Sequence, residues 1–268
     1  MLDLTASPQM LRAWAAAMWE HRDVFAMMAR SDFQVRYKRA TFGVLWAVIL
    51  PLLQATVLTI IFARVIHVPS GRAFGAFVLS GVLPWGYFSA TVGVGSTAIV
   101  DNSGLADKVW FPRALLALVP AASNLASLGV SLIVLVVSLP LLGVPIGPRL
   151  LLLGPATLLL IAFTAALCLG LSALHVYFRD VRFIVQAALL LWFYVTPLVY
   201  PVTALGGLRP LIDANPLTGV VTLFRMATVG ATTNWARPVA IAAACTVVTL
   251  GVAADAHRRR DRLFVDLL

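Results

Sequence analysis

Charged residues are scarce in this sequence, and this scarcity excludes several classes of function. Only 12% of the 268 residues are charged, and only two basic residues are lysines, Lys38 and Lys108. Neither lysine stands in a glycine-rich G-x-x-x-x-G-K-[ST] loop, so the sequence contains no phosphate-binding loop of that type. The four histidines are scattered without a second ligand at helical spacing, and no metal site is predicted.

Acidic residues are missing from the interior of the apolar stretches. All eleven lie outside these stretches or at their ends. A carboxylate in the hydrocarbon of a membrane is costly and usually couples transport to an ion, so ion-coupled transport is disfavoured. Cysteine is rare as well, and Cys168 and Cys245 both lie inside apolar stretches. This placement favours packing roles and indicates no disulfide framework.

Apolar residues, by contrast, make up 61% of the chain and gather in six long stretches. The stretches cover residues 42–66, 74–100, 115–142, 150–176, 183–200 and 238–254. About 20 apolar residues in a helix cross a hydrocarbon core about 30 Å thick. We therefore predict an all-α integral membrane protein with six transmembrane helices. It comprises an N-terminal segment (1–41), a membrane domain (42–254) and a basic tail (255–268).

The net charge of +9 is spread along the ends of the apolar stretches. It forms no single patch with interleaved aromatic residues, so no nucleic-acid partner is predicted. Six crossings put both termini on one side, together with fourteen of the lysines and arginines. Five arginines fall on the other side: Arg72, Arg149, Arg209, Arg225 and Arg237. By the positive-inside rule, both termini are predicted to be cytoplasmic.

The N-terminal segment has the pattern of an amphipathic helix. Its apolar residues recur at helical spacing: Leu11, Trp14, Met18, Phe25 and Met28. We expect this helix to lie in the inner membrane interface, and packing on a partner protein is the alternative. Asp32, Arg36 and Tyr37 follow it and are predicted to form a charged hinge, because the first two are spaced for an i, i+4 ion pair.

The segment between the fifth and sixth stretches departs from simple crossing. Pro197 and Pro201 interrupt the helix, and Asn215 followed by Pro216 is typical of a new helix start. The residues after it form a short amphipathic repeat: Leu217, Val220, Val221, Phe224 and Thr228. About fourteen residues are too few to cross a bilayer. We therefore expect two short re-entrant helices, which would form an outer gate.

Aromatic residues collect toward the outer side of the second and fifth stretches. They are Trp85, Tyr87 and Phe88, and Trp192, Tyr194 and Tyr200. Trp and Tyr gather at membrane surfaces whatever the function, so an interfacial role is one interpretation of this pattern.

Several segments together resemble one family. They are residues 31–39 (SDFQVRYKR), 42–46 (FGVLW) with Pro51, 108–113 (KVWFPR), 177–181 (YFRDV) and 197–201 (PLVYP). In this order and at these places, they resemble the permease subunits of ATP-binding cassette exporters of the polysaccharide-export type.

The resemblance implies a transporter subunit that is not itself an enzyme. Such a permease pairs with a second copy of itself and binds two copies of a separate ATPase, which holds the ATP and Mg²⁺. The cargo would be a lipid-linked polysaccharide of the O-antigen, teichoic acid, capsule or galactan type, and the location the bacterial inner or plasma membrane. The alternative is a permease that exports drugs or small amphiphiles. A secondary carrier or a membrane-embedded enzyme is a third, less favoured alternative.

The resemblance also places an ATPase-coupling helix in the first inner loop. It implies that Lys108, Phe111, Pro112 and Arg113 contact the ATPase; the alternative is that the basic residues serve orientation alone. Arg179 and Asp180, in the second inner loop, are expected to brace the neighbouring spans or to touch the ATPase.

The resemblance further suggests that some of the aromatic residues of the second and fifth stretches, with Pro197, line a channel or gate. Flat apolar faces would suit a transported chain that must bind weakly and move on. The interfacial role is the alternative.

Overall fold

The computed structural model describes residues 16–38, 41–62, 73–106, 111–201, 207, 209–230 and 234–260, except the side chains of 105, 106 and 260. The described elements are helical. In chain order they are α2 (Arg22–Tyr37), η1 (Gly43–Leu45), α3 (Trp46–Ile60), α4 (Phe74–Gly95), α5 (Ala98–Asp101), α6 (Ser103–Ala106), α7 (Ala114–Ser123), α8 (Leu125–Leu141), η3 (Pro148–Leu152), α9 (Leu153–Tyr177), α10 (Val181–Val195), α11 (Arg209–Asp213), α12 (Pro216–Thr228) and α13 (Ala236–Arg260).

Five helical stretches of the described chain are long and apolar enough to cross a membrane. They are Gly43–Ile60, Phe74–Gly95, Ala114–Leu141, Pro148–Tyr177 and Ala236–Arg259. Each coincides with a predicted stretch, so the prediction of a helical, multi-pass membrane protein is confirmed.

The remaining predicted span is shorter than the sequence suggested. The prediction covered 183–200, whereas α10 ends at Val195 after 15 residues. Thr196 has extended backbone angles, φ −82° and ψ 131°, because the ring of Pro197 disfavours a helical conformation in the residue before it. α10 is therefore apolar but falls below the length of the other five.

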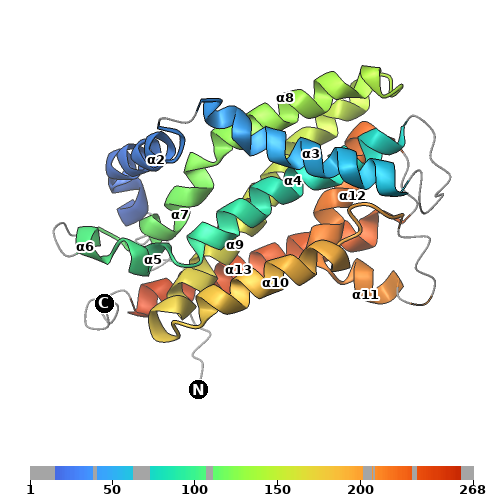
Figure 1. The fold of residues 1–268 in the computed structure, drawn as a ribbon. Helices are drawn as coiled ribbons and strands as arrows, with labels where there is room; N and C mark the ends of the chain where they lie inside the picture. Colours follow the sequence, from blue (N-terminus) through green and yellow to red (C-terminus); the bar gives the residue numbers. More distant parts are fainter. Residues whose placement is uncertain are drawn as a thin grey trace.

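α4 and α9 form the centre of the bundle (Figure 1). α4 is buried over most of its length and carries Phe88 and Leu83 into the core. Its glycines allow close neighbours: a Cβ on Gly81 would lie 3.1 Å from the carbonyl oxygen of Leu198, and one on Gly86 3.1 Å from Cγ of Pro51. α3 and α10, in contrast, are exposed over most of their surfaces.

The two ends of the bundle differ in the elements they carry. α2, α5, α6 and the last turns of α13 lie at one end, and α11 lies at the other (Figure 1). α13 runs without interruption across the predicted boundary at residue 255 and contains an i, i+4 ion pair between Arg259 and Asp255, 2.8 Å apart.

Candidate functional site at the junction of the N-terminal helix and the bundle

The third membrane stretch is divided into two helices at Asn124. α7 ends at Ser123 and α8 begins at Leu125, so Asn124 ends one helix and starts the next. Pro120 lies one turn earlier and has no N–H to donate to the helix. Its carbonyl oxygen accepts both the backbone N–H of Asn124, at 3.1 Å, and the Ser123 hydroxyl, at 3.3 Å.

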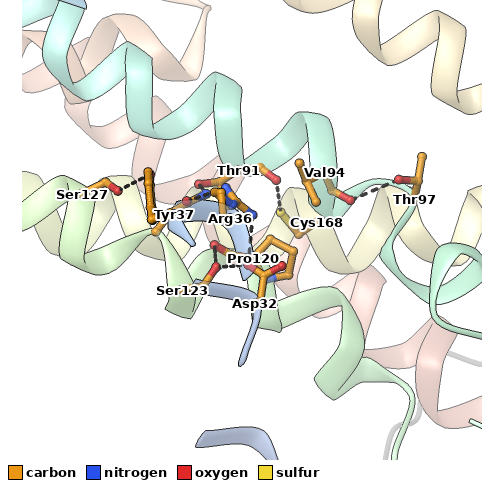
Figure 2. Close-up of polar contacts among 11 residues, drawn as sticks. Asp32, Arg36, Tyr37, Thr91, Val94, Thr97, Pro120, Ser123, Ser127 and Cys168 are labelled. Atoms are coloured by element: carbon orange, nitrogen blue, oxygen red, sulfur yellow. Dashed lines mark hydrogen bonds and ion pairs between the residues drawn. The ribbon is translucent and has the colours of Figure 1, made fainter. Parts of the chain in front are cut away.

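α2 binds this break through its last turns (Figure 2). Arg36 donates to Oδ1 of Asn124 at 2.7 Å, and the Ser123 hydroxyl donates to Oδ2 of Asp32 at 2.5 Å. The predicted i, i+4 ion pair between Asp32 and Arg36 is present, with 3.0 Å between Oδ2 and Nη2. All the predicted hinge residues therefore lie at the break, and their role as a hinge stays a prediction.

Tyr37 makes a separate contact one turn into α8, where its hydroxyl lies 3.0 Å from the hydroxyl of Ser127. Polar groups that leave water are stabilised when they are paired in this way, and hydrogen bonds to charged groups contribute about 1.5–3 kcal/mol each. The end of α2 is thus attached to α7 and α8 by specific polar contacts as well as by packing.

The network continues from Asn124 into the core. Its Nδ2 donates to the hydroxyl of Thr91 on α4 at 3.0 Å, and the thiol of Cys168 on α9 donates to the Thr91 carbonyl oxygen at 3.7 Å. Asn124 and Thr91 are both buried. The carboxamide of Asn124 therefore joins α2, through Arg36, to the central helix α4.

The apolar face of the N-terminal segment also packs on the protein. Met18, Phe25 and Met28 contact a cluster that includes Ile99 and Leu115. The other two residues of the predicted face, Leu11 and Trp14, lie outside the described residues. The described part of this segment therefore packs on its own chain, and its place in the membrane interface stays a prediction.

The predicted coupling residues of the first inner loop are mainly interior. Phe111 is only 4% exposed, Pro112 is buried beside it, and Arg113 is 7% exposed. Lys108 lies outside the described residues. Within the single chain, Phe111 packs with Ile99 and therefore does not project as an apolar knob toward a partner.

The two inner loops are instead joined by residues that the sequence analysis did not single out as a pair. Nη2 of Arg182 lies 2.5 Å from Oδ1 of Asp101, and Oδ2 of the same carboxylate accepts the hydroxyl of Thr97 at 2.7 Å. The predicted pair, Arg179 and Asp180, is exposed in the turn before α10. The contact between Asp101 and Arg182 had one signal in the sequence: the two residues carry opposite charges, one just after the second apolar stretch and the other just before the fifth.

Most of the predicted channel aromatics pack inside the chain. Phe88 is fully buried, and its ring centroid lies 6.0 Å from that of Phe163 and 5.4 Å from that of Trp192. The ring centroids of Trp85 and Phe193 are 5.6 Å apart. Burial of these rings assigns them to the core of the single subunit, and a channel role for them stays a prediction.

Tyr194 and Tyr200 are less buried than the predicted channel aromatics of α4. Tyr194 is 67% exposed, and the hydroxyl of Tyr200 donates to the Tyr194 carbonyl oxygen at 2.8 Å. Tyr87, by contrast, is buried and donates to the carbonyl oxygen of Ala121 at 3.1 Å, whereas Pro197 is buried in the chain reversal after α10.

The helix start at Asn215 is confirmed. Its side-chain oxygen accepts the backbone N–H of Leu217 at 3.1 Å and the indole N–H of Trp192 at 2.9 Å. Its amide nitrogen donates to the hydroxyl of Thr196 at 3.0 Å. The predicted apolar repeat of α12 is buried, as its pattern required. Asn215 therefore fixes the end of α10 against the start of α12.

Arg225 is buried within the bundle. The sequence placed it on the outer side of the membrane without predicting its burial, and it is 5% exposed. Its guanidinium lies 3.5 Å from the ring centroid of Phe77 on α4 and donates to the carbonyl oxygen of Leu198 at 2.9 Å. A guanidinium that stacks on an aromatic ring and donates to a backbone oxygen is a stable way to bury this side chain.

Comparison with known proteins identifies the family. The family described as "ABC-2 type transporter" matches residues 23–229. The chain belongs to the ABC-2 type transporter family. The resemblance seen in the sequence is thereby confirmed.

Individual ABC-2 relatives match most of the chain. An "O-antigen export system permease protein RfbA" of Myxococcus xanthus is 30% identical over 258 residues, which are 93% of this chain and 96% of the relative. Two proteins of the same description from Klebsiella pneumoniae are each 28% identical, over 224 and 211 residues. They cover 80% and 76% of this chain, and 83% and 79% of the relatives.

The ABC-2 match coincides with the junction described above. It begins within the first turn of α2 and ends just after α12, so it includes the Asn124 break, both inner loops and the Asn215 contacts. These features therefore lie in the part of the chain that defines the family.

Proposed function

We propose that this chain is the permease subunit of an ATP-binding cassette exporter that moves a lipid-linked polysaccharide across the bacterial inner membrane. The observation that carries the proposal is the similarity to O-antigen export permeases along nearly the whole length of both chains. A match of this extent covers the inner loops and the outer segment as well as the spans.

Energy would come from a separate ATPase bound at the end of the bundle that carries α2, α5 and α6. The sequence itself has no phosphate-binding loop. The contact surface that we favour consists of the exposed residues of the two inner loops. They are Arg179, Asp180, Asp101 and Arg182, and we add Lys108 from the sequence. ATP and Mg²⁺ would bind in the partner. Movement of these loops would reach α4 through the Asn124 network.

A second copy of the chain would cover the face formed by α3 and α10. Both helices pack on α4: Gly86 meets Pro51 of α3, and Gly93 faces Leu189 of α10 at 3.9 Å from its ideal Cβ. Both also expose large apolar side chains, such as Leu53 of α3. Exposed Gln54 and Gln186 interrupt these apolar surfaces, which favours a protein partner or a polar route over lipid. The polysaccharide would pass between the two copies.

Six crossings remain the topology that we propose, with α10 as the fifth. The positive-inside rule then places α2 and the end of α13 in the cytoplasm. α11 and α12 would enter and return from the outer surface as re-entrant helices, and the Asn215 contacts would hold them closed against α10. α12 has 13 residues, which supports re-entry, because a full crossing needs about 20.

The test is reconstitution of the chain with the ATPase encoded beside its gene. We expect the two proteins to purify together and ATP turnover to rise when a lipid-linked oligosaccharide is added to the vesicles. Stimulation by amphiphilic drugs without any response to the oligosaccharide would favour the alternative cargo. Uphill solute movement by this chain without a nucleotidase would contradict the proposal altogether.

A further inference from the structure

A cavity of about 580 Å³ lies between α11 and the start of α13. Its lining includes Arg209, Asp213, Asn234 and Arg237. α11 is at the end of the bundle opposite α2 (Figure 1), so this cavity is remote from the Asn124 junction. None of the contacts described for that junction involves it.

The charges that line the cavity are unequal. Nε of Arg209 lies 3.8 Å from Oδ2 of Asp213, whose side chain is only 10% exposed. Arg237 is exposed and has no acidic partner among the described residues. Among the described residues, the lining thus holds two guanidinium groups and one carboxylate, an excess of one positive charge.

The cavity adjoins the start of an apolar helix that is long enough to cross a membrane. α13 begins at Ala236, and its apolar span follows directly. Trp235 precedes it and is 46% exposed. Tryptophan and arginine at the end of a span lie at the level of the lipid headgroups, where a basic cavity between helices can bind an anionic headgroup.

We propose that this cavity binds the phosphate of an anionic phospholipid headgroup, with Arg237 and Arg209 as the binding residues. A guanidinium can donate two parallel hydrogen bonds to a phosphate, and Arg237 forms no ion pair with the described residues. Phosphatidylglycerol, with a net negative charge, matches the excess positive charge of the lining better than phosphatidylcholine, whose headgroup is neutral overall. The proposal requires only that the chain is a membrane protein, and it is independent of the cargo.

The experiment is native mass spectrometry of the delipidated full-length protein after addition of phosphatidylglycerol or phosphatidylcholine. We expect the wild-type protein to retain phosphatidylglycerol preferentially. R237Q should weaken this retention about fivefold, and R237K should largely preserve it, since one basic residue near an anionic lipid surface contributes about that factor. R209Q should also weaken it, but R237Q is the decisive variant because Arg237 makes no ion pair within the described chain.

Arg149 offers a matched control at the same end of the bundle. It is a basic residue of η3 whose Nη2 donates to the carbonyl oxygen of Pro145, and it does not line the cavity. R149Q should therefore retain phosphatidylglycerol as the wild-type protein does. Equal losses in R149Q and R237Q would overturn the proposal, as would undiminished retention in R237Q or equal retention of phosphatidylcholine. Displacement of the lipid by inorganic phosphate at millimolar concentration would show that the cavity prefers a free anion and would refute the lipid assignment.

Discussion

Arg36 of the N-terminal helix donates a 2.7 Å hydrogen bond to Asn124, a residue 88 positions later at the break between α7 and α8. The other end of the same carboxamide donates to Thr91 of the central helix. A movement of α2 would therefore change the surroundings of α4 through one side chain. This link and the helix break at Asn124 are the basis for the predicted hinge.

N124A should destabilise the protein, because it removes one buried and one partly buried hydrogen bond and takes from the Thr91 hydroxyl its hydrogen-bond partner among the described residues. We expect a loss of about 1–3 kcal/mol in the free energy of unfolding. A double-mutant cycle of N124A with R36A, measured by thermal unfolding in detergent, should give a coupling energy of about 1–2 kcal/mol between the two residues.

S138A is the control for this cycle. Ser138 also lies on α8, but its hydroxyl bonds only within its own helix, to the carbonyl oxygen of Leu135. It should show no coupling to R36A. If N124A and R36A were simply additive, the link between α2 and the bundle would not run through Asn124.

Local signals in the sequence predicted the elements of this fold well. The start of α12 could be predicted from Asn215 and Pro216 alone, because a capping side chain and a proline in the first turn act within a few residues. The same holds for the ion pair of Asp32 and Arg36, whose spacing along one helix is sufficient. The apolar lengths predicted five of the spans for the same reason.

Contacts between distant segments were not predictable in this way. The burial of Arg225 was not predicted, because no residue near it in the sequence indicates a contact with Phe77, 148 positions earlier, or with the backbone of Leu198. Phe111 looked like an exposed knob in a polar loop, although α5 and α7 close around it. Asn124 was overlooked since one amide in a long apolar stretch counts little toward hydropathy. Burial of such residues depends on which helices become neighbours.

The contact between Asp101 and Arg182 should affect energy coupling more than stability. Both side chains are 45% exposed, and an exposed ion pair contributes about 0.2–1 kcal/mol, so D101N and R182Q should unfold almost as the wild-type protein does. We expect both to lower the oligosaccharide-stimulated ATP turnover of the reconstituted complex, because the two inner loops would no longer move together. The charge-swapped double variant, D101R with R182D, should recover part of it.

D255N provides the comparison for that experiment. Asp255 pairs with Arg259 at a similar exposure, but both residues lie on α13 and join no loops. Because the pair that D255N breaks lies within one helix, ATP turnover of this variant should match the wild-type value. Turnover reduced as much by D255N as by D101N would point to a general effect of charge at the inner surface.

R225A should be among the most destabilising substitutions in the chain. It removes the stacking on Phe77 and the hydrogen bond to Leu198, which together should cost about 2–4 kcal/mol. R225K should lose less, since an ammonium group keeps the charge and can still donate. Thermal unfolding in detergent measures the stability of both variants. R237A, on the exposed first turn of α13, is the control, and its free energy of unfolding should lie within about 0.5 kcal/mol of the wild-type value. A negligible effect of R225A would mean that the buried guanidinium does not hold the segment after α10.

Gly219 is required by the close approach of α12 to α13. A Cβ at this position would overlap the carbonyl oxygen of Pro238 and lie 2.7 Å from Cβ of Ala242. G219A must therefore push the two helices apart, and overpacking of this kind costs about 1–3 kcal/mol. Gly129 on α8 is the matched control, because a Cβ there meets nothing within 4 Å, and G129A should be neutral or stabilising by up to about 1 kcal/mol. Unfolding midpoints in the same detergent compare the two variants. An unchanged midpoint for G219A would show that α12 can shift on α13 at little cost, which is the behaviour expected of an outer segment that is not held in place by the Asn215 contacts.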